Sequence, residues 1–197
     1  MRLLVVYCHP DPDSFNAAVL ARVVEAATKA GHQTDVLDLY AEGFEPAMGR
    51  DERRVHFDTG QNQAPVAAHI ARLQRAEGLI FVYPTWWYGQ PAMLKGWLDR
   101  VLVPGVAFHL PQDGAPIRPG LTGIRLVGVV TTLGCPWWFW TFYMGAPGRR
   151  ILTRGIKAIC AKGCTTFWLA LHNMDSASDT TRRSFLERVG RRIGALA

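Results

Sequence analysis

The most constraining feature of the sequence is an apolar segment that ends in an aromatic turn. Residues 79–83 (LIFVY) are continuously apolar, a pattern typical of a strand buried on both faces of a parallel sheet. Pro84 ends this strand, because proline cannot donate a hydrogen bond to a neighbouring strand. The turn after it carries Trp86, Trp87 and Tyr88. Open α/β sheets bind ligands at the carboxyl ends of their strands, so we expect this aromatic surface to pack against a flat, redox-active ring.

Strand-like and helix-like patterns alternate five times along the chain. The predicted strands cover residues 3–7, 34–39, 79–83, 124–132 and 165–171. The predicted helices cover residues 15–30, 64–76, 91–101, 147–161 and 179–196. This alternation is typical of a doubly wound parallel sheet with helices on both faces, and right-handed connections favour the strand order 2-1-3-4-5. We predict one α/β domain over residues 1–197, with its site where the loops after strands one, three and four converge.

The composition is that of a soluble globular protein, with 49% hydrophobic and 19% charged residues. No apolar run reaches 18 residues, which argues against a transmembrane helix. The chain begins with a short strand pattern rather than a signal peptide. The four cysteines form no CxxC pair, so we interpret them as free thiols in a reducing compartment and predict no metal site. These features predict a cytoplasmic protein.

The net charge of +6 is unevenly distributed. Residues 140–197 hold ten Lys/Arg against three Asp/Glu, a balance of +7, whereas residues 1–139 hold twelve against thirteen, a balance of −1. One interpretation is that these charges are solvated helix faces. The other is a basic side that attracts an anionic cofactor, an acidic partner or a membrane surface. No basic run is interleaved with aromatic residues, so we predict no nucleic-acid partner.

The loop after the first strand opens directly into a helix. The N-terminus of a helix offers unpaired N–H groups and a partial positive charge, both of which attract phosphate. We predict phosphate contacts from His9, the Ser14 hydroxyl and the amides up to Asn16. The alternative is a plain helix cap beside a solvated acidic loop, in which Asp11 and Asp13 repel anions. Neither the GxGxxG nor the GxxxxGK[ST] phosphate-binding motif is present.

The loops after the third and fourth strands offer the two kinds of group that an isoalloxazine ring needs. Such a ring requires stacking against its faces and hydrogen-bond donors at its polar edge. Residues 84–89 combine flat side chains with backbone N–H groups, and Thr131 and Thr132 offer hydroxyl and backbone groups. The alternative is that the aromatic residues of the third loop fill the core or a dimer interface.

Residues 137–143 (WWFWTFY) hold six aromatic residues in seven positions, more than one face of any element can bury. Such a cluster is typical of a binding or association surface. We interpret part of it as a lid that makes a slot for a planar substrate, bounded by Trp137, Trp138, Phe139 and Phe142. The alternative is a membrane-surface anchor or a subunit contact, and both interpretations can hold together. Residues 172–174, after the fifth strand, are interpreted mainly as a turn, with contact to the rim of the site as the alternative.

Three motifs point to one family. They are His9…Ser14-Phe15-Asn16, Pro84-x-x-Trp87-Tyr88-Gly89-x-Pro91-x-x-Leu94-Lys95-Gly96-Trp97 and Thr131-Thr132-x-Gly134. Together they resemble the NAD(P)H:quinone oxidoreductase (DT-diaphorase-like) family of flavodoxin-like flavoproteins. The resemblance covers residues 1 to about 135 well and the rest loosely.

The resemblance implies a flavodoxin-like fold with FAD or FMN at the edge of the sheet, and a homodimer with its sites near the interface. It also implies that hydride passes from NADPH or NADH to flavin N5 and then to a quinone in the same slot. The residues implied to hold the phosphate and ribityl side are His9, Ser14, Phe15 and Asn16. Those implied to line the ring are Pro84, Thr85, Trp86, Trp87 and Tyr88, with Thr131, Thr132 and Gly134 at its other edge.

The chain departs from the family pattern after the fourth strand. A tyrosine and a histidine that relay protons in better-known members are replaced here by Phe139 and Gly145, and Leu133 replaces a glycine. Tyr143 is the candidate for the missing phenol. This departure concerns proton transfer more than hydride transfer, because the flavin supplies the hydride chemistry.

The leading hypothesis is therefore a flavin-dependent NAD(P)H oxidoreductase that reduces quinones or similar planar acceptors by ping-pong hydride transfer. The alternative is a regulatory flavoprotein subunit of a membrane transport system such as potassium efflux. In that alternative, the basic C-terminal third and the aromatic run at residues 137–143 form the docking surface.

Overall fold

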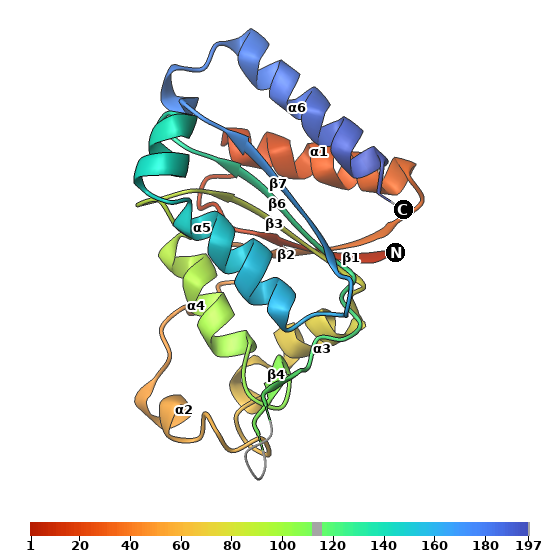
Figure 1. The fold of residues 1–197 in the computed structure, drawn as a ribbon, viewed down its shortest axis with the longest axis vertical. Helices are drawn as coiled ribbons and strands as arrows, with labels where there is room; N and C mark the ends of the chain where they lie inside the picture. Colours follow the sequence, from red (N-terminus) through yellow and green to blue (C-terminus); the bar gives the residue numbers. More distant parts are fainter. Residues whose placement is uncertain (112–115, 197) are drawn as a thin grey trace.

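A five-stranded parallel sheet forms the centre of the protein. The computed structural model describes residues 1–111 and 116–196. Its strands are β1 (Arg2–Tyr7), β2 (Gln33–Asp38), β3 (Gly78–Pro84), β6 (Leu126–Thr132) and β7 (Thr165–Leu171). They lie in the order β2-β1-β3-β6-β7, and every pairing is parallel (Figure 1). This order confirms the predicted arrangement 2-1-3-4-5.

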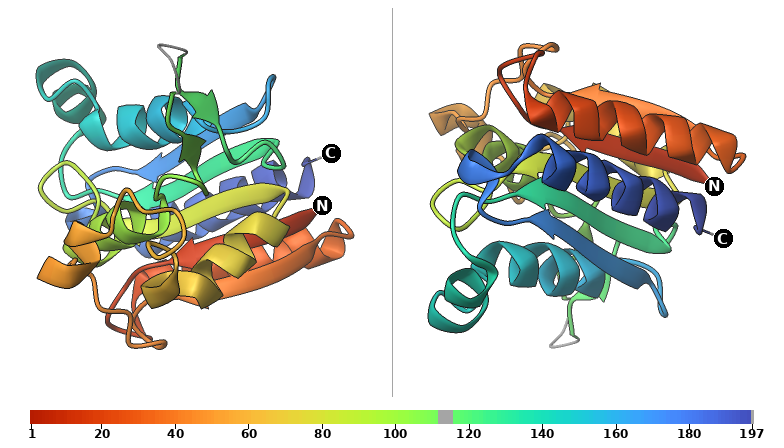
Figure 2. Two further views of the ribbon diagram at one scale, coloured as in Figure 1. Left: turned by 90° about the horizontal axis from the view of Figure 1, so that it is seen from below. Right: turned by 90° about the horizontal axis from the view of Figure 1, so that it is seen from above.

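Helices cover both faces of the sheet. One face carries α1 (Phe15–Lys29) and α6 (Asp179–Gly194), and the other carries α3 (Ala67–Arg75), α4 (Ala92–Val101) and α5 (Pro147–Arg150) (Figures 1 and 2). Side chains of β1 alternate between two cores: Val5 packs with the α1 and α6 side, and Val6 with the α3 and α4 side. β3 is buried along its whole length, as its apolar run predicts. No helix in residues 1–111 or 116–196 combines the length and apolarity needed to cross a membrane.

Serine side chains cap the two helices of the first face. The Ser14 hydroxyl accepts a hydrogen bond from the Ala17 amide at 3.2 Å, and Ser178 accepts one from the Thr181 amide at 3.2 Å. Each cap satisfies one of the N–H groups that the first turn leaves free. Gly31 follows α1 with a φ of +80°, a left-handed conformation that glycine adopts without strain. The predicted cap and stop of this helix are therefore observed.

The segments after β6 are less regular than predicted. The helix expected over residues 147–161 has only one α-helical turn, α5, and continues as a π-helical segment, Ile151–Ile156. A second π-helical segment, Phe139–Tyr143, lies in the aromatic run. Wider turns of this kind are uncommon and are often found at functional sites.

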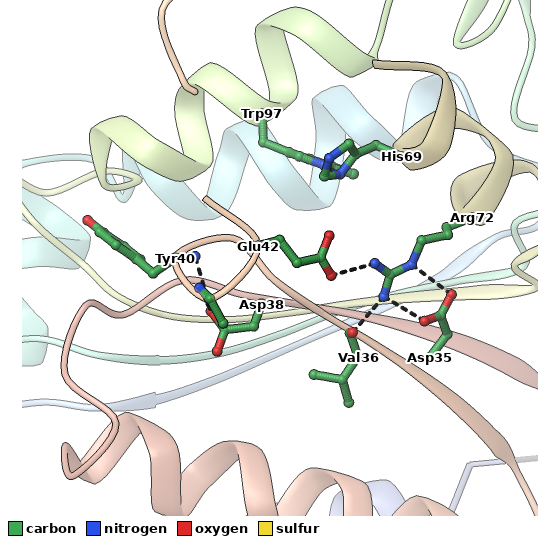
Figure 3. Close-up of polar contacts among 9 residues, drawn as sticks. Asp35, Val36, Asp38, Tyr40, Glu42, His69, Arg72 and Trp97 are labelled. Carbon is green, nitrogen blue, oxygen red and sulfur yellow. Dashed lines mark hydrogen bonds and ion pairs between the residues drawn. The ribbon is translucent and has the colours of Figure 1, made fainter. Parts of the chain in front are cut away.

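The long connection at residues 40–63 is held to the sheet by Arg72 of α3. Figure 3 shows its guanidinium between two carboxylates: both oxygens of Asp35, at 2.6 and 3.0 Å, and Glu42 at 2.6 Å. The same group donates to the Val36 carbonyl oxygen. The connection also contains a short helix, α2 (Arg50–Arg54), that the sequence pattern did not predict. These ion pairs hold the start of the connection against the sheet.

Two residues of α4 hold the same connection from the other side. The Arg100 Nε lies 2.9 and 3.0 Å from the Glu52 carboxylate oxygens, and the two side chains are only 10% and 11% exposed. Arg100 also donates to the Glu45 carbonyl oxygen. At Gly96 a Cβ would collide with the Pro46 carbonyl oxygen, so only glycine allows this contact. α4 follows the aromatic turn directly, so these contacts also fix the position at which the chain leaves that turn.

We predict that Glu52→Ala lowers the free energy of unfolding by about 3–5 kcal/mol, because it leaves the buried Arg100 guanidinium without a counter-charge. The matched control is Asp99→Ala, which breaks the exposed Lys95 pair on the same helix and should cost about 0.5 kcal/mol. Urea unfolding followed by circular dichroism measures both values. Equal losses in the two variants would contradict the prediction.

Candidate functional site

The loops after β1, β3 and β6 meet at the carboxyl edge of the sheet. Pro84 of β3 lies opposite Thr132 of β6, and the Thr85 amide donates to the Thr132 carbonyl oxygen at 2.8 Å. The Thr85 and Thr131 hydroxyl groups are 2.9 Å apart. On the other side of β3, the Cys8 amide donates to the Val82 carbonyl oxygen at 3.0 Å. The predicted convergence of the three loops is therefore present in the structure.

Asn16 links the first loop to the end of β6. Its side-chain nitrogen donates to the Thr132 hydroxyl at 3.1 Å, and both side chains are buried. Its carbonyl oxygen, Oδ1, is buried and has no hydrogen-bond donor among the described residues. A buried acceptor without a donor is costly in a protein interior. Oδ1 is thus a group that a bound ligand with an O–H or N–H could satisfy.

The start of α1 keeps the features of an anion site. The first turn of an α-helix leaves backbone N–H groups unpaired, here beginning at Phe15. The acidic residues of the loop, Asp11 and Asp13, are exposed to solvent, and the Asp11 carboxylate accepts the Asp13 amide at 2.9 Å. His9 lies at the same end, with its ring centroid 6.4 Å from that of Trp86. The helix cap and the predicted phosphate contacts are therefore compatible.

The aromatic turn has a strained backbone. The Gly89 amide donates to the Trp86 carbonyl oxygen at 3.0 Å, and the two residues between them have left-handed φ values, 47° for Trp87 and 63° for Tyr88. Such values are rare for bulky residues, cost of order 1–3 kcal/mol each and cluster at functional sites. The Trp140 indole donates to the Tyr88 carbonyl oxygen at 3.4 Å and supports the turn. In this turn the Trp87 side chain is 94% exposed to solvent.

An open cleft of about 570 Å³ lies between this turn and the end of β6. Its lining residues are Pro84, Thr85, Trp86, Trp87, Thr132, Leu133, Gly134, Met174 and Asp175. A second hollow of about 300 Å³ adjoins it and is lined by Thr85, Trp87, Tyr88, Leu133, Gly134 and Cys135. A space of this size is in the range of small-molecule and cofactor sites. The cleft fits a planar ring that carries a polar chain, because it combines indole rings with threonine groups. The buried Asn16 Oδ1, which lacks a hydrogen-bond donor among the described residues, lies behind its Thr132 wall.

The aromatic run after β6 divides between the core and the surface. Trp140 is buried and stacks on Trp168, with ring centroids 5.2 Å apart. We call the others the aromatic patch: Trp137, Trp138, Phe139, Phe142 and Tyr143. Apart from the half-buried Phe139 they are exposed, and none lines the two hollows described above. Phe139 joins the patch to the rim of the cleft through Tyr88, at 6.0 Å between centroids.

The predicted roles of the aromatic patch stay predictions. Tyr143, the candidate for proton transfer, is 77% exposed and stacks on Phe139 at 4.9 Å between centroids. A lid would require the patch to move toward the cleft past the Phe139–Tyr88 contact. The patch therefore lies next to the cleft, outside its walls.

Two residues that follow β7 also line the cleft. Met174 and Asp175 line the cleft because the chain after β7 pairs with the chain after β6: the Leu133 amide donates to the Leu171 carbonyl oxygen, and the Met174 amide to the Leu133 carbonyl oxygen. Residues 172–174 are predicted mainly as a turn, with contact to the rim of the site as the alternative, and Met174 makes that contact. Asp175 lies outside the predicted residues. The signal that could have found it is positional, since the strand beside β6 must also end at this edge.

The thiols and the histidine near the cleft are uncharged near neutral pH. Burial raises the pKa of Cys8 to about 12 and also raises the pKa of Cys135. Burial lowers the pKa of His172, whose Nδ1 lies 3.3 Å from the Cys135 carbonyl oxygen. Neither thiol is therefore activated as a nucleophile. No group of three His, Cys, Asp or Glu residues is placed to hold a metal ion in the described part of the chain.

Comparison with known proteins agrees with the fold and the motifs. The family model described as "Flavodoxin-like fold" matches residues 1–178. Smu.1420 from Streptococcus mutans UA159 is 30% identical, with a TM-score of 0.85 over all of both chains. The NAD(P)H:quinone oxidoreductase from Methanothermobacter marburgensis is 25% identical, with a TM-score of 0.81 over 98% of this chain and 96% of that one.

Curated relatives match over a shorter length. The mouse (Mus musculus) ribosyldihydronicotinamide dehydrogenase [quinone] is 34% identical over 131 residues, which are 56% of this chain and 54% of the relative. The rat (Rattus norvegicus) NAD(P)H dehydrogenase [quinone] 1 is 34% identical over 123 residues, 54% of this chain and 45% of the relative. The chain thus spans about half the length of the curated relatives it matches. It belongs to the flavodoxin-like family, and these matches confirm the resemblance to NAD(P)H:quinone oxidoreductases.

We predict that His172→Gln reduces the loss of stability in acid. Burial lowers the pKa of His172 in the folded state, so the unfolded chain binds more protons as the pH falls through the ordinary histidine value of about 6.5. Stability contributed by the neutral ring is therefore present at high pH and lost in this window. Urea unfolding at about pH 7.5 and about pH 5.5 should show a smaller difference for the variant than for the wild type. The exposed His109→Gln serves as control and should keep the wild-type difference.

Proposed function

We propose that this protein is a cytoplasmic, homodimeric, flavin-dependent NAD(P)H oxidoreductase that reduces quinones or similar planar acceptors. The observation that carries the proposal is the cleft between the aromatic turn and the end of β6, whose Thr132 wall is hydrogen-bonded to Asn16 at the start of α1. This arrangement joins a slot for a flat ring to an anion-attracting helix end. Relatives whose names include NAD(P)H dehydrogenase [quinone] and NAD(P)H:quinone oxidoreductase support the same activity.

The residues of the cleft fit a flavin. Trp86 and Trp87 offer flat surfaces, and the backbone of the turn offers N–H groups to a polar ring edge. Thr132 and Gly134 bound the opposite side, and the buried Thr131 supports them through its hydroxyl contact with Thr85. The start of α1 would hold the phosphate. When bound, FAD or FMN supplies the chemistry of hydride transfer from NADPH or NADH to an acceptor. The protein's part is to bind and orient the planar groups.

A ping-pong order agrees with the shape of the site. The cleft and its adjoining hollow share Thr85, Trp87, Leu133 and Gly134, so they lie side by side. A nicotinamide donor and a quinone acceptor would then use the same opening in turn. In this proposal the aromatic patch borders that opening, and Trp137, Trp138, Phe139 and Phe142 contact the acceptor when it enters.

A second candidate function is a regulatory flavoprotein subunit of a membrane transport system such as potassium efflux. The observation that favours it is the aromatic patch, which is followed by exposed Arg149 and Arg150. Residues 114–174 contain seven Lys/Arg and no Asp or Glu, so the chain around the patch is basic. Co-purification with a membrane transporter, together with negligible quinone turnover, would favour this candidate over the enzyme.

The test of the main proposal starts with the purified protein. We expect the yellow absorbance of a flavin, and mass spectrometry of the released cofactor identifies it as FAD or FMN. Stopped-flow reduction with NADH and with NADPH, followed by oxidation with a naphthoquinone, tests both half-reactions and the donor. A colourless protein that takes up neither FAD nor FMN would exclude the proposed activity.

We predict that Trp87→Ala weakens flavin binding about tenfold, because it removes an aromatic face from the cleft and such contacts contribute of order 1 kcal/mol beyond area burial. The matched control is Trp137→Ala, which removes an exposed indole outside the cleft wall and should leave the dissociation constant within about twofold. Titration of flavin fluorescence measures both. The same loss in both variants would show that Trp87 has no special contact with the ring.

A further inference from the structure

We propose that Asp175 is a cofactor-binding residue whose carboxylate accepts hydrogen bonds from the hydroxyl groups of the flavin's sugar chain. This inference rests on the proposed function and deepens it, since it names the part of the cofactor that the turn after β7 contacts. None of the family motifs quoted in the sequence analysis includes Asp175.

Asp175 is held in the cleft by an ordered turn. Met174–Ser176 forms a 3₁₀ turn between β7 and α6, preceded by Asn173 in a left-handed conformation with φ 51°. The Met174 amide donates to the Leu133 carbonyl oxygen at 2.9 Å, and the Ser176 amide to the Asn173 carbonyl oxygen at 3.2 Å. The first bond ties the turn to the loop after β6 and the second closes the turn itself, so Asp175 lines the cleft from a fixed backbone.

Close contact with Gly134 places the carboxylate against the adjoining loop, the one after β6. A Cβ built on Gly134 would lie 2.6 Å from the Asp175 Oδ2, closer than atoms of this kind approach. Glycine at this position therefore leaves room for the carboxylate on the cleft wall. The same glycine belongs to the Thr131-Thr132-x-Gly134 motif, so the contact lies at the predicted ring edge.

The chemistry of the carboxylate selects the ligand group. Asp175 is the one ionisable side chain among the described residues that line the 570 Å³ cleft, and no described residue donates a hydrogen bond to it. An ionised carboxylate accepts hydrogen bonds and does not donate them. It therefore suits O–H or N–H groups and disfavours phosphate and the carbonyl oxygens of the ring.

The sugar chain is the part of a flavin that offers several such groups. In the proposed mode the ring lies by Trp87 and Gly134 and the phosphate lies at the start of α1, so the hydroxyl chain joins them along the wall that contains Thr132. Asp175 lines the same wall. Asn16 lies behind this wall: its side-chain nitrogen donates to the Thr132 hydroxyl, and its buried Oδ1 has no donor among the described residues. A carboxylate on the wall between the ring and the phosphate matches a chain with several hydroxyl groups.

The experiment compares three flavins that differ in their chain. Lumiflavin has the ring and no hydroxyl groups, riboflavin adds the sugar chain, and FMN adds the phosphate. Dissociation constants are measured for apoprotein by titration of flavin fluorescence, for the wild type, Asp175→Ala and Asp175→Asn. The control is Asp179→Ala, an exposed carboxylate outside the cleft, and urea unfolding shows whether each variant is folded.

We expect Asp175→Ala to weaken riboflavin and FMN about tenfold each, equivalent to about 1.4 kcal/mol, and to leave lumiflavin unchanged. Asp175→Asn should lose less, because its amide oxygen still accepts a hydrogen bond. Asp179→Ala should change none of the three values.

Three results would overturn this role. Equal weakening of all three flavins would mean that Asp175 only shapes the cleft. Tighter FMN binding with unchanged riboflavin would mean that it acts only by repelling the phosphate. No change for any flavin would mean that it makes no contact. If the wild type itself binds none of the three flavins, the proposed function fails, which is distinct from each of these results.

Discussion

One backbone hydrogen bond, from the Thr85 amide to the Thr132 carbonyl oxygen, positions most of the site. Pro84 cannot donate to β6, so the pairing of β3 and β6 would end there without a further donor. The Thr85 amide extends the pairing by one residue, and its hydroxyl contacts that of Thr131 at 2.9 Å. The aromatic turn thus begins at a fixed distance from Gly134. The width of the cleft depends on this junction.

The strained turn and the aromatic run depend on each other. Left-handed φ values at Trp87 and Tyr88 persist only where surrounding contacts over-determine them. The Trp140 indole supplies one contact to the Tyr88 carbonyl oxygen, and stacking on Trp168 fixes Trp140 in turn. Trp140 is therefore a structural member of a run whose other indoles are exposed. This explains why so many aromatic residues follow β6 without forming one surface.

Much of the fold could be predicted because its signals are local. Local sequence determines several of these features: the apolar run of β3, the Ser14 cap and the Gly31 stop. The alternation of strands and helices, with right-handed connections, gives the order of the strands in the sheet. The loops that meet at the site followed from that order. Their convergence needed no knowledge of side-chain contacts.

The remaining features could not be predicted because they depend on contacts between distant residues. The π-helical segments at 139–143 and 151–156 have no composition signal, since aromatic and aliphatic residues suit several helical forms. The ordering of residues 40–63 depends on Arg72 and Arg100, which appear in sequence as ordinary charges on helices. Asp175 also belongs to no recognised sequence motif. Its place in the cleft follows only from the pairing of the chains after β6 and β7.

The charges around the cleft favour one orientation of an elongated ligand. The partial positive charge at the start of α1 attracts a phosphate, and the Asp175 carboxylate on the cleft wall repels one. Both effects favour the same orientation of an elongated cofactor, with its anionic end at α1 and its uncharged ring beside Trp87. A reversed ligand would bring phosphate toward a carboxylate and leave the helix end unpaired. In the proposed mode, a lone acidic residue in the cleft and a capped helix outside it therefore act together to orient the ring.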